Sequence, residues 1–340
     1  MTINIALCTY DGIVLGCDSL SSVMDSAILP YRNNQFVVDQ YGQPITGSDG
    51  FQLIKFKPGE TQQIVTTVFS GVSKMFCVYQ DDETSVAAVT SGMAILGGVT
   101  IAEQAKRFRR RVKNDKQAFA KVEDVANDFK TFMHEIWVAD FNKSGVPEIQ
   151  YFPSIQFIIA GYGKDDGYGR VFRVDLFNDS LVEQFPADDH TGVCWGGTAN
   201  YVERLLRGSD GLLQYKVSRE LTRAMTQQRE GTIADLSRAL TEAGVTLPSG
   251  LDIQVREEQL PTLPWDSVTA DIDYGNLSTQ YAVDFVELLV NIQSGMQRFG
   301  RGIPIVGGRT HIGVLKRGEH FEMLNEPQLQ HRHTGYADEF

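Results

Sequence analysis

The chain has 340 residues, 42% of them hydrophobic, which is enough to bury the core of one large domain. Its formal net charge of -12 argues against a nucleic-acid backbone or an anionic membrane surface as the main partner. No apolar run is long enough to cross a bilayer, and the four cysteines form no CxxC pair, so we expect a cytoplasmic protein with reduced thiols.

The first predicted element is a β-hairpin. Apolar residues alternate with small or polar ones over residues 3–7, Tyr-Asp-Gly at residues 10–12 supplies the turn, and the extended pattern resumes over residues 13–17. The second arm ends on a lone acid, Asp18. A polar, irregular excursion is predicted next, over about residues 20–50.

A second hairpin follows, with predicted arms at residues 51–56 and 63–69 and a Pro-Gly turn between them. The small-residue stretch 85–99 contains three glycines and predicts a loop or a buried helix. The remaining predicted elements, in chain order, are helices over 101–112 and 121–138, strands over 155–160 and 170–176, a strand ending near 195, a helix after 197, a helix over 278–296 and a strand over 312–315.

This order of elements predicts an α+β fold in which sheets pack between helical layers. We expect a single domain over residues 1–340. Its predicted parts are a core at about 1–19, 50–208 and 276–318, insertions at about 20–50 and 209–275, and a polar tail over 320–340.

Thr2 is the first candidate for catalysis. Methionine aminopeptidase removes an initiator methionine when the next side chain is small, and removal of Met1 would give Thr2 both a hydroxyl nucleophile and its own α-amine. An α-amine has a reference pKa of about 8, which suits a general base at neutral pH. Asp18, at the end of the neighbouring strand, is placed to orient this pair or to hold a cation beside it.

Four segments, in order, resemble the proteasome β-type subunits and their bacterial relatives, the HslV and Anbu peptidases. Residues 2–19 are similar to the family's opening hairpin, and VFSGVS at 68–73 is similar to its oxyanion-hole segment. IIAGYG at 158–163 resembles the strand and turn after the two central helices, and WGGTANY at 195–201 resembles the turn before the third helix. The resemblance implies a four-layer αββα sandwich of the N-terminal nucleophile (Ntn) hydrolase type.

The resemblance also implies an activity and a partner set. It makes Thr2 the nucleophile of a threonine protease, Asp18 its companion acid and Gly71 the donor of the oxyanion-hole amide. Peptides or unfolded proteins would be the substrates, and the chain would assemble into a homo-oligomeric ring. No phosphate-binding loop of the Walker type is present, so any ATP-driven unfolding would need a separate ATPase. We expect no cofactor.

The chain departs from the family pattern at three positions. The family's strand lysine aligns with Gln52, and the nearest cation, Lys55, reaches the same face of the strand only if a one-residue bulge intervenes. The family's serine falls at Gly197, with Thr198 beside it as a substitute hydroxyl. The family's second acid has no counterpart, because Gly302 or Ile303 stands in its place.

These departures leave three functions open: a threonine peptidase, a catalytically inactive subunit kept as a structural or assembly module, and an Ntn hydrolase of small amides.

Two other features of the sequence, a basic segment and a pair of histidines, have interpretations unrelated to catalysis. The basic segment KRFRRRVK at 106–113 is interpreted as a solvated helix end, or else as a dock for acidic side chains. His331 and His333 indicate a polar tail rather than a metal site.

Overall fold

The structure is a computed structural model that describes residues 2–27, 36–55, 62–186, 190–245, 264–265, 269–300 and 303–325. Its contacts divide the chain into two compact units. The first unit combines Met1–Thr198 with Asp273–Phe340, and the second is Ala199–Ile272.

The first unit contains an antiparallel five-stranded sheet that begins with the predicted hairpin. The hairpin is confirmed: its strands pair from Asn4 opposite Cys17 to Cys8 opposite Ile13, and Thr9 N–H donates to Gly12 O across the turn at 2.9 Å. The strands in spatial order are β12 (Gly192–Gly197), β1 (Ile3–Cys8), β2 (Ile13–Asp18), β13 (Thr310–Leu315) and β14 (Glu322–Met323).

A second antiparallel five-stranded sheet lies in the same unit. Its strands in spatial order are β11 (Ser180–Glu183), β10 (Arg170–Asp175), β9 (Ile155–Tyr162), β6 (Ser85–Gly92) and β5 (Met75–Gln80). The interpretation of residues 85–99 as a loop or a buried helix is wrong, because residues 85–92 form β6. This strand is buried on both faces over residues 85–91 and therefore lacks the apolar-polar alternation that marks a half-buried strand.

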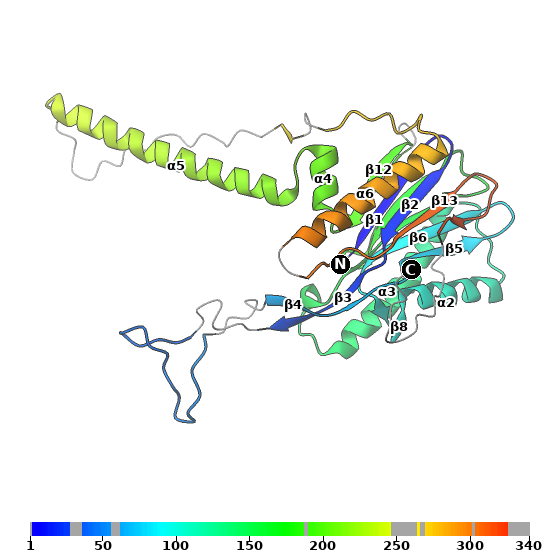
Figure 1. Ribbon diagram of the computed structural model, residues 1–340, viewed down its shortest axis with the longest axis horizontal. Helices are drawn as coiled ribbons and strands as arrows, with labels where there is room; N and C mark the ends of the chain where they lie inside the picture. The colour runs from blue at the N-terminus through cyan, green and yellow to red at the C-terminus, as the bar shows by residue number, and fades with distance from the viewer. Residues whose placement is uncertain are drawn as a thin grey trace, which may run out of the picture. The chain divides into compact units, whose positions relative to one another are not determined.

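The two sheets pack face to face. Small and branched side chains fill the space between them, including Ala6 and Leu15 from the first sheet and Ala87, Val89 and Ile158 from the second. Helix α6 (Thr279–Phe299) packs on the outer face of the first sheet, as Figure 1 shows. The helix packs closely on the sheet, since a Cβ on Gly16 in β2 would collide with the side chain of Val286 in α6.

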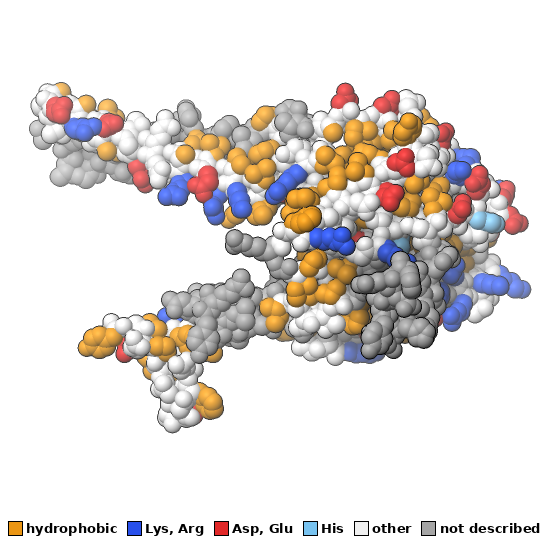
Figure 2. Space-filling view, in the orientation of Figure 1, with side chains coloured by type: hydrophobic (Ala, Val, Ile, Leu, Met, Phe, Trp, Pro, Cys, Tyr) orange, Lys and Arg blue, Asp and Glu red, His pale blue; other side chains and the backbone are white. Residues whose placement is uncertain are grey.

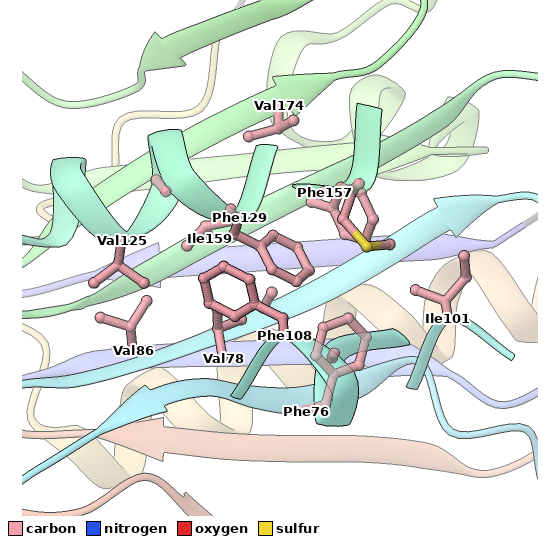
Figure 3. Packing of buried hydrophobic residues seen from close by; sticks show 14 of the residues in the cluster. Phe76, Val78, Val86, Ile101, Phe108, Val125, Phe129, Phe157, Ile159 and Val174 are labelled. Carbon is pink, nitrogen blue, oxygen red and sulfur yellow. The ribbon is translucent and has the colours of Figure 1, made fainter. Parts of the chain in front are cut away.

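Helices α2 (Ile101–Asn114) and α3 (Val122–Ser144) cover the second sheet and bury an aromatic core against it. In Figure 3, Phe108 of α2 and Phe129 of α3 lie together over the strands, and their ring centroids are 5.1 Å apart in an edge-to-face arrangement. Phe129 in turn contacts Phe157 of β9 at 5.2 Å. The predicted start of α2 is confirmed, because the Thr100 hydroxyl accepts from Glu103 N–H at 3.2 Å.

The second hairpin differs from its prediction. Residues 62–69 form a strand, β4 (Gln62–Phe69), but its partner is β3 (Ser21–Ala27) within the expected irregular excursion. Residues 51–55 make only isolated bridges, such as Thr46 opposite Gln52. The hydrophobic pattern predicted strands correctly and their pairing incorrectly, because pairing depends on residues distant in sequence.

A short ribbon, β7 (Ile95–Leu96) with β8 (Val99–Thr100), leads into α2. The second unit contains α4 (Asn200–Arg207) and the long helix α5 (Gly211–Glu242), in which no residue is buried. Asp210 caps α5 by accepting from Leu213 N–H at 2.6 Å. None of the helices in the described residues is long and apolar enough to span a membrane.

Candidate active site

Asp18 lies at the end of β2, and its carboxylate joins four segments of the chain. Oδ1 accepts from Ile3 N–H at 3.2 Å and from Lys74 Nζ at 2.8 Å. Oδ2 accepts from Leu20 N–H at 3.2 Å and from Gly307 N–H at 2.9 Å. Asp18 is 1% exposed, and burying a carboxylate at this depth is unfavourable unless hydrogen-bond donors and a counterion replace its lost hydration.

Lys74 is the cation of the site, and it immediately precedes β5. Its side chain is 6% exposed and forms an ion pair with Asp18. It also donates to Leu20 O. An ammonium group has three N–H donors, and these two bonds use two of them. Burial lowers the pKa of Lys74 below its ordinary value, and the neighbouring Asp18 carboxylate opposes that shift.

Thr2 opens the strand beside this ion pair. It is 3% exposed, and its carbonyl accepts from Thr198 N–H at 2.7 Å. Thr2 and Lys74 line one pocket together with Ser21, Ser73 and other residues described below. The hydrogen bond from Ile3 N–H to Asp18 ties the residue after Thr2 to the ion pair.

Ser91 and Gly92, at the end of β6, also line the pocket. Gly92 has a φ of +103°, in the region where a side chain is strained. A Cβ on Gly92 would also collide with the carbonyl of Ser154 in the preceding turn of β9. Glycine is therefore required here, and its backbone comes close to the pocket that contains Thr2.

The structure brings only some of the sequence-predicted residues together. Thr2 and Asp18 lie at the site, and the backbone of Thr198 contacts Thr2. Lys55 is exposed and follows the isolated bridge of Ile54, and Gly71 lies in the turn after β4; neither lines the pocket.

Of the other expected positions, Gly197 packs on the Thr2 carbonyl, and Ile303 is 54% exposed. Gly302, His331 and His333 lie outside the described residues.

Sequence reasoning missed Lys74, Ser91 and Gly92, although signals for them were present. Lys74 immediately precedes the apolar run Met75–Tyr79, and a polar residue directly before such a run is typical of the start of a strand. Ser91-Gly92 follows residues 85–90 in the same way that Ser70-Gly71 follows the predicted strand at residues 63–69. Recognising residues 85–92 as a strand would have identified Ser91 and Gly92 as the residues at its end.

The chemistry available at this site is nucleophilic. One pocket is lined by Thr2, which carries a hydroxyl, by Lys74, which carries a buried ammonium, and by the glycine Gly92. These are the kinds of group that covalent attack on a carbonyl uses. No cluster of three or more metal-binding side chains is found in the part of the chain that the structure describes.

No protein-family model matches this chain, and no curated protein matches it. Similar solved structures include Anbu from Hyphomicrobium sp. strain MC1, at 10% identity and a TM-score of 0.43 over 96% of this chain and 86% of that one. A Gly-1 mutant of that protein matches at 10% identity and 0.46, over 95% and 87%. Anbu from Yersinia bercovieri, described as an ancestral beta-subunit, matches at 11% identity and 0.45, over 96% and 88%.

Proposed function

We propose that this protein is a proteasome-like N-terminal threonine hydrolase that cleaves peptide amide bonds through Thr2. The observation that carries the proposal is that Thr2 shares a pocket with Lys74, whose ammonium pairs with Asp18 at 2.8 Å. The sheets packed between α6 on one side and α2 with α3 on the other support the four-layer αββα sandwich that such a hydrolase would have.

Catalysis begins after removal of Met1, which turns the Thr2 nitrogen into a free amine. Thr2 Oγ attacks the amide carbonyl while the amine takes its proton and then delivers it to the leaving nitrogen. Lys74 favours the attack because its positive charge stabilises the developing alkoxide. Water then hydrolyses the acyl-enzyme with help from the same amine, which restores Thr2.

Gly92, rather than Gly71, is the backbone donor that we assign to the oxyanion. It lines the same pocket as Thr2, whereas Gly71 lies outside the pocket lining. A backbone N–H held by a constrained glycine is pre-oriented, so it costs little reorganisation when negative charge develops on the substrate oxygen.

Assembly of several copies is part of the proposal. Four large apolar side chains on α6 are at least 44% exposed: Tyr281, Leu288, Met296 and Phe299. Figure 2 shows hydrophobic side chains gathered over this helix. An exposed apolar helix face is common where another subunit packs, which fits a ring of like chains. A separate ATPase would supply any unfolding of protein substrates.

One observation favours a catalytically inactive subunit as the second candidate. Gly197 offers no hydroxyl where the resemblance places a serine, and a Cβ there would collide with the carbonyl of Thr2. The intact Lys74–Asp18 pair opposes this alternative, since a buried ion pair is costly to keep without a use.

The test combines intact-mass measurement with active-site labelling of the full chain. We expect purified protein to lack Met1 and a peptide epoxyketone to add to Thr2, with peptide cleavage blocked in parallel. Thr2→Ala should show neither labelling nor cleavage, and Thr2→Ser should keep both at a reduced rate.

A version that carries residues ahead of Thr2 is the matched control, because it keeps the hydroxyl and removes the free amine. It should resist labelling. Retention of Met1, or equal labelling of the Thr2→Ala variant, would replace the hydrolase with the inactive subunit. Cleavage of small amides without cleavage of peptides would indicate the third function, a small-amide hydrolase.

A further inference from the structure

The pocket that contains Thr2 is small. Its volume is about 30 Å³, only roughly two to three times the 10–15 Å³ that a single buried water molecule needs. A cavity that holds benzene has a volume on the order of 150 Å³. The pocket of Thr2 therefore has room for a methyl or hydroxymethyl group, but not for the side chain of leucine or phenylalanine.

The position of this pocket decides which part of a peptide it would hold. In the proposed reaction, Thr2 Oγ attacks a carbonyl carbon, and the residue that carries this carbonyl has its Cβ two bonds from the attacked atom. Reacting atoms approach to about 3–3.5 Å before the new bond forms. The side chain on the acyl side of the cleaved bond therefore lies beside Thr2, where the pocket is.

Ile101, the first residue of α2, lines this pocket and is 2% exposed. It belongs to the same buried cluster as Phe108 and Phe129, and all three are labelled in Figure 3. Its N–H donates to the carbonyl of Ala94, which also lines the pocket, at 3.2 Å. Because protein interiors are close-packed, Ile101 cannot move aside without disturbing the core behind it.

Two other residues of the lining are held by backbone hydrogen bonds. Val72 N–H donates to Ser19 O at 3.0 Å, and Thr90 N–H donates to Lys74 O at 2.9 Å. A larger substrate side chain would have to break such a bond or displace Ile101, and each costs free energy. The size of the pocket is therefore a limit on the substrate.

We propose that the pocket of Thr2 limits the acyl-side residue of the cleaved bond to side chains no larger than those of alanine and serine, and that Ile101 sets this limit. The inference rests on the proposed hydrolase and adds the class of peptide that it cleaves. One extra methylene changes kcat/KM by about 10- to 200-fold in a closed pocket, so the limit should be sharp. Lysine and arginine are disfavoured a second time, because their charge would meet the ammonium of Lys74.

Cleavage of peptides that differ only at the acyl-side residue tests the limit. We expect kcat/KM to be highest for alanine or serine and at least about tenfold lower for leucine and phenylalanine. Cleavage after leucine or phenylalanine that is as fast as cleavage after alanine would overturn the inference and leave the hydrolase standing. Failure of every peptide, together with absence of epoxyketone labelling at Thr2, would overturn the hydrolase and this inference with it.

A graded series of substitutions tests the role of Ile101. Ile101→Val shortens the side chain by one carbon atom and Ile101→Ala by three, so each step should enlarge the pocket. The ratio of kcat/KM for the leucine peptide to that for the alanine peptide should rise with each step, by at least about tenfold in total. Ile101→Val keeps most of the buried surface, so the test remains decisive if Ile101→Ala does not fold.

Val112→Ala is the matched control for this series. Val112 is a buried core residue of the same helix and does not line the pocket. Its truncation should lower Tm and leave the ratio of the two kcat/KM values unchanged. An unchanged ratio in the Ile101 variants, or an equal rise in Val112→Ala, would show that Ile101 does not set the limit.

Discussion

Two Ser-Gly turns in this chain look alike in sequence and differ in the structure. Ser70-Gly71 follows β4, and Ser91-Gly92 closes β6; both glycines have positive φ, at +77° and +103°. A Cβ on Gly71 would meet nothing within 4 Å, whereas a Cβ on Gly92 would collide with the carbonyl of Ser154. Only the second turn lines the pocket of Thr2.

The difference between the two turns indicates that the strand before a turn decides whether the turn can hold a backbone group in place. β4 pairs with β3 in a two-stranded ribbon, while β6 lies inside the second sheet between β5 and β9. A turn on a buried central strand is held by neighbours on both sides. A turn on a ribbon is held only by its partner, so it is a weaker platform for a catalytic backbone group.

The largest expected effect separates the two candidate lysines. Lys74→Met removes the cation from a carboxylate that is 1% exposed, and we expect a loss of about 3 kcal/mol in the free energy of unfolding, together with loss of labelling at Thr2. Lys55→Met, at an exposed position, should change stability by less than about 0.5 kcal/mol. Urea unfolding and epoxyketone labelling measure both.

Equal effects of these two substitutions on stability and labelling would show that the buried Lys74 and the exposed Lys55 do not differ in role. If Lys55→Met alone abolished labelling, Lys55 would supply the catalytic cation and the pocket of Thr2 and Lys74 would not be the active site. A Lys74→Arg variant sharpens the test, because it keeps the charge beside Asp18 but not the compact ammonium; we expect it to recover stability more than labelling.

The next effect concerns the glycines themselves. Gly92→Ala adds a methyl group that collides with the Ser154 carbonyl at a positive φ, and we expect a loss of about 2–4 kcal/mol with abolished labelling. Gly71→Ala meets open space and carries only the cost of its φ, about 1 kcal/mol. Similar unfolding midpoints for the two variants would show that the pocket wall tolerates a side chain.

The sequence predicted the parts of the fold that depend on near neighbours. The opening hairpin was found from alternation and a Gly turn, and α2 from its Thr100 cap, because each signal lies within a few residues. β6 was missed since a strand buried on both faces has no period to detect. The β3–β4 pairing was missed because the insertion separates its two strands.

In the candidate site, too, the residues predicted correctly are those that lie near one another in the sequence. Thr2 and Asp18 come from one hairpin, so local pattern and resemblance located both. Lys74 and Gly92 reach the pocket from outside that hairpin, through strand pairings that the sequence does not state. The resemblance supplied the types of residue to look for and aligned them with Gln52, Lys55 and Gly71. In the structure, the lysine and the glycine that line the pocket with Thr2 are Lys74 and Gly92.

The smallest effect concerns pH and His311, which lies in β13 opposite Cys17 of β2. Burial lowers the pKa of His311 below its ordinary value of 6.5; nearby Lys74 acts in the same direction and Asp18 opposes it. Below pH 6.5 the unfolded chain therefore binds a proton that the folded chain does not. Folding stability should fall as the pH drops below 6.5, with a slope from this residue of at most about 1.4 kcal/mol per pH unit.

His311→Asn removes this one contribution and leaves the other titrating groups in place. Urea unfolding of both proteins between pH 7.5 and 5 should therefore show a shallower loss of stability in the variant, and the difference between the two curves isolates His311. Parallel curves would mean that the folded protein accepts the proton on His311 as readily as the unfolded chain does. A second positive charge would then be tolerated beside Lys74, which would place the two groups farther apart, or better hydrated, than the buried site next to Thr2 requires.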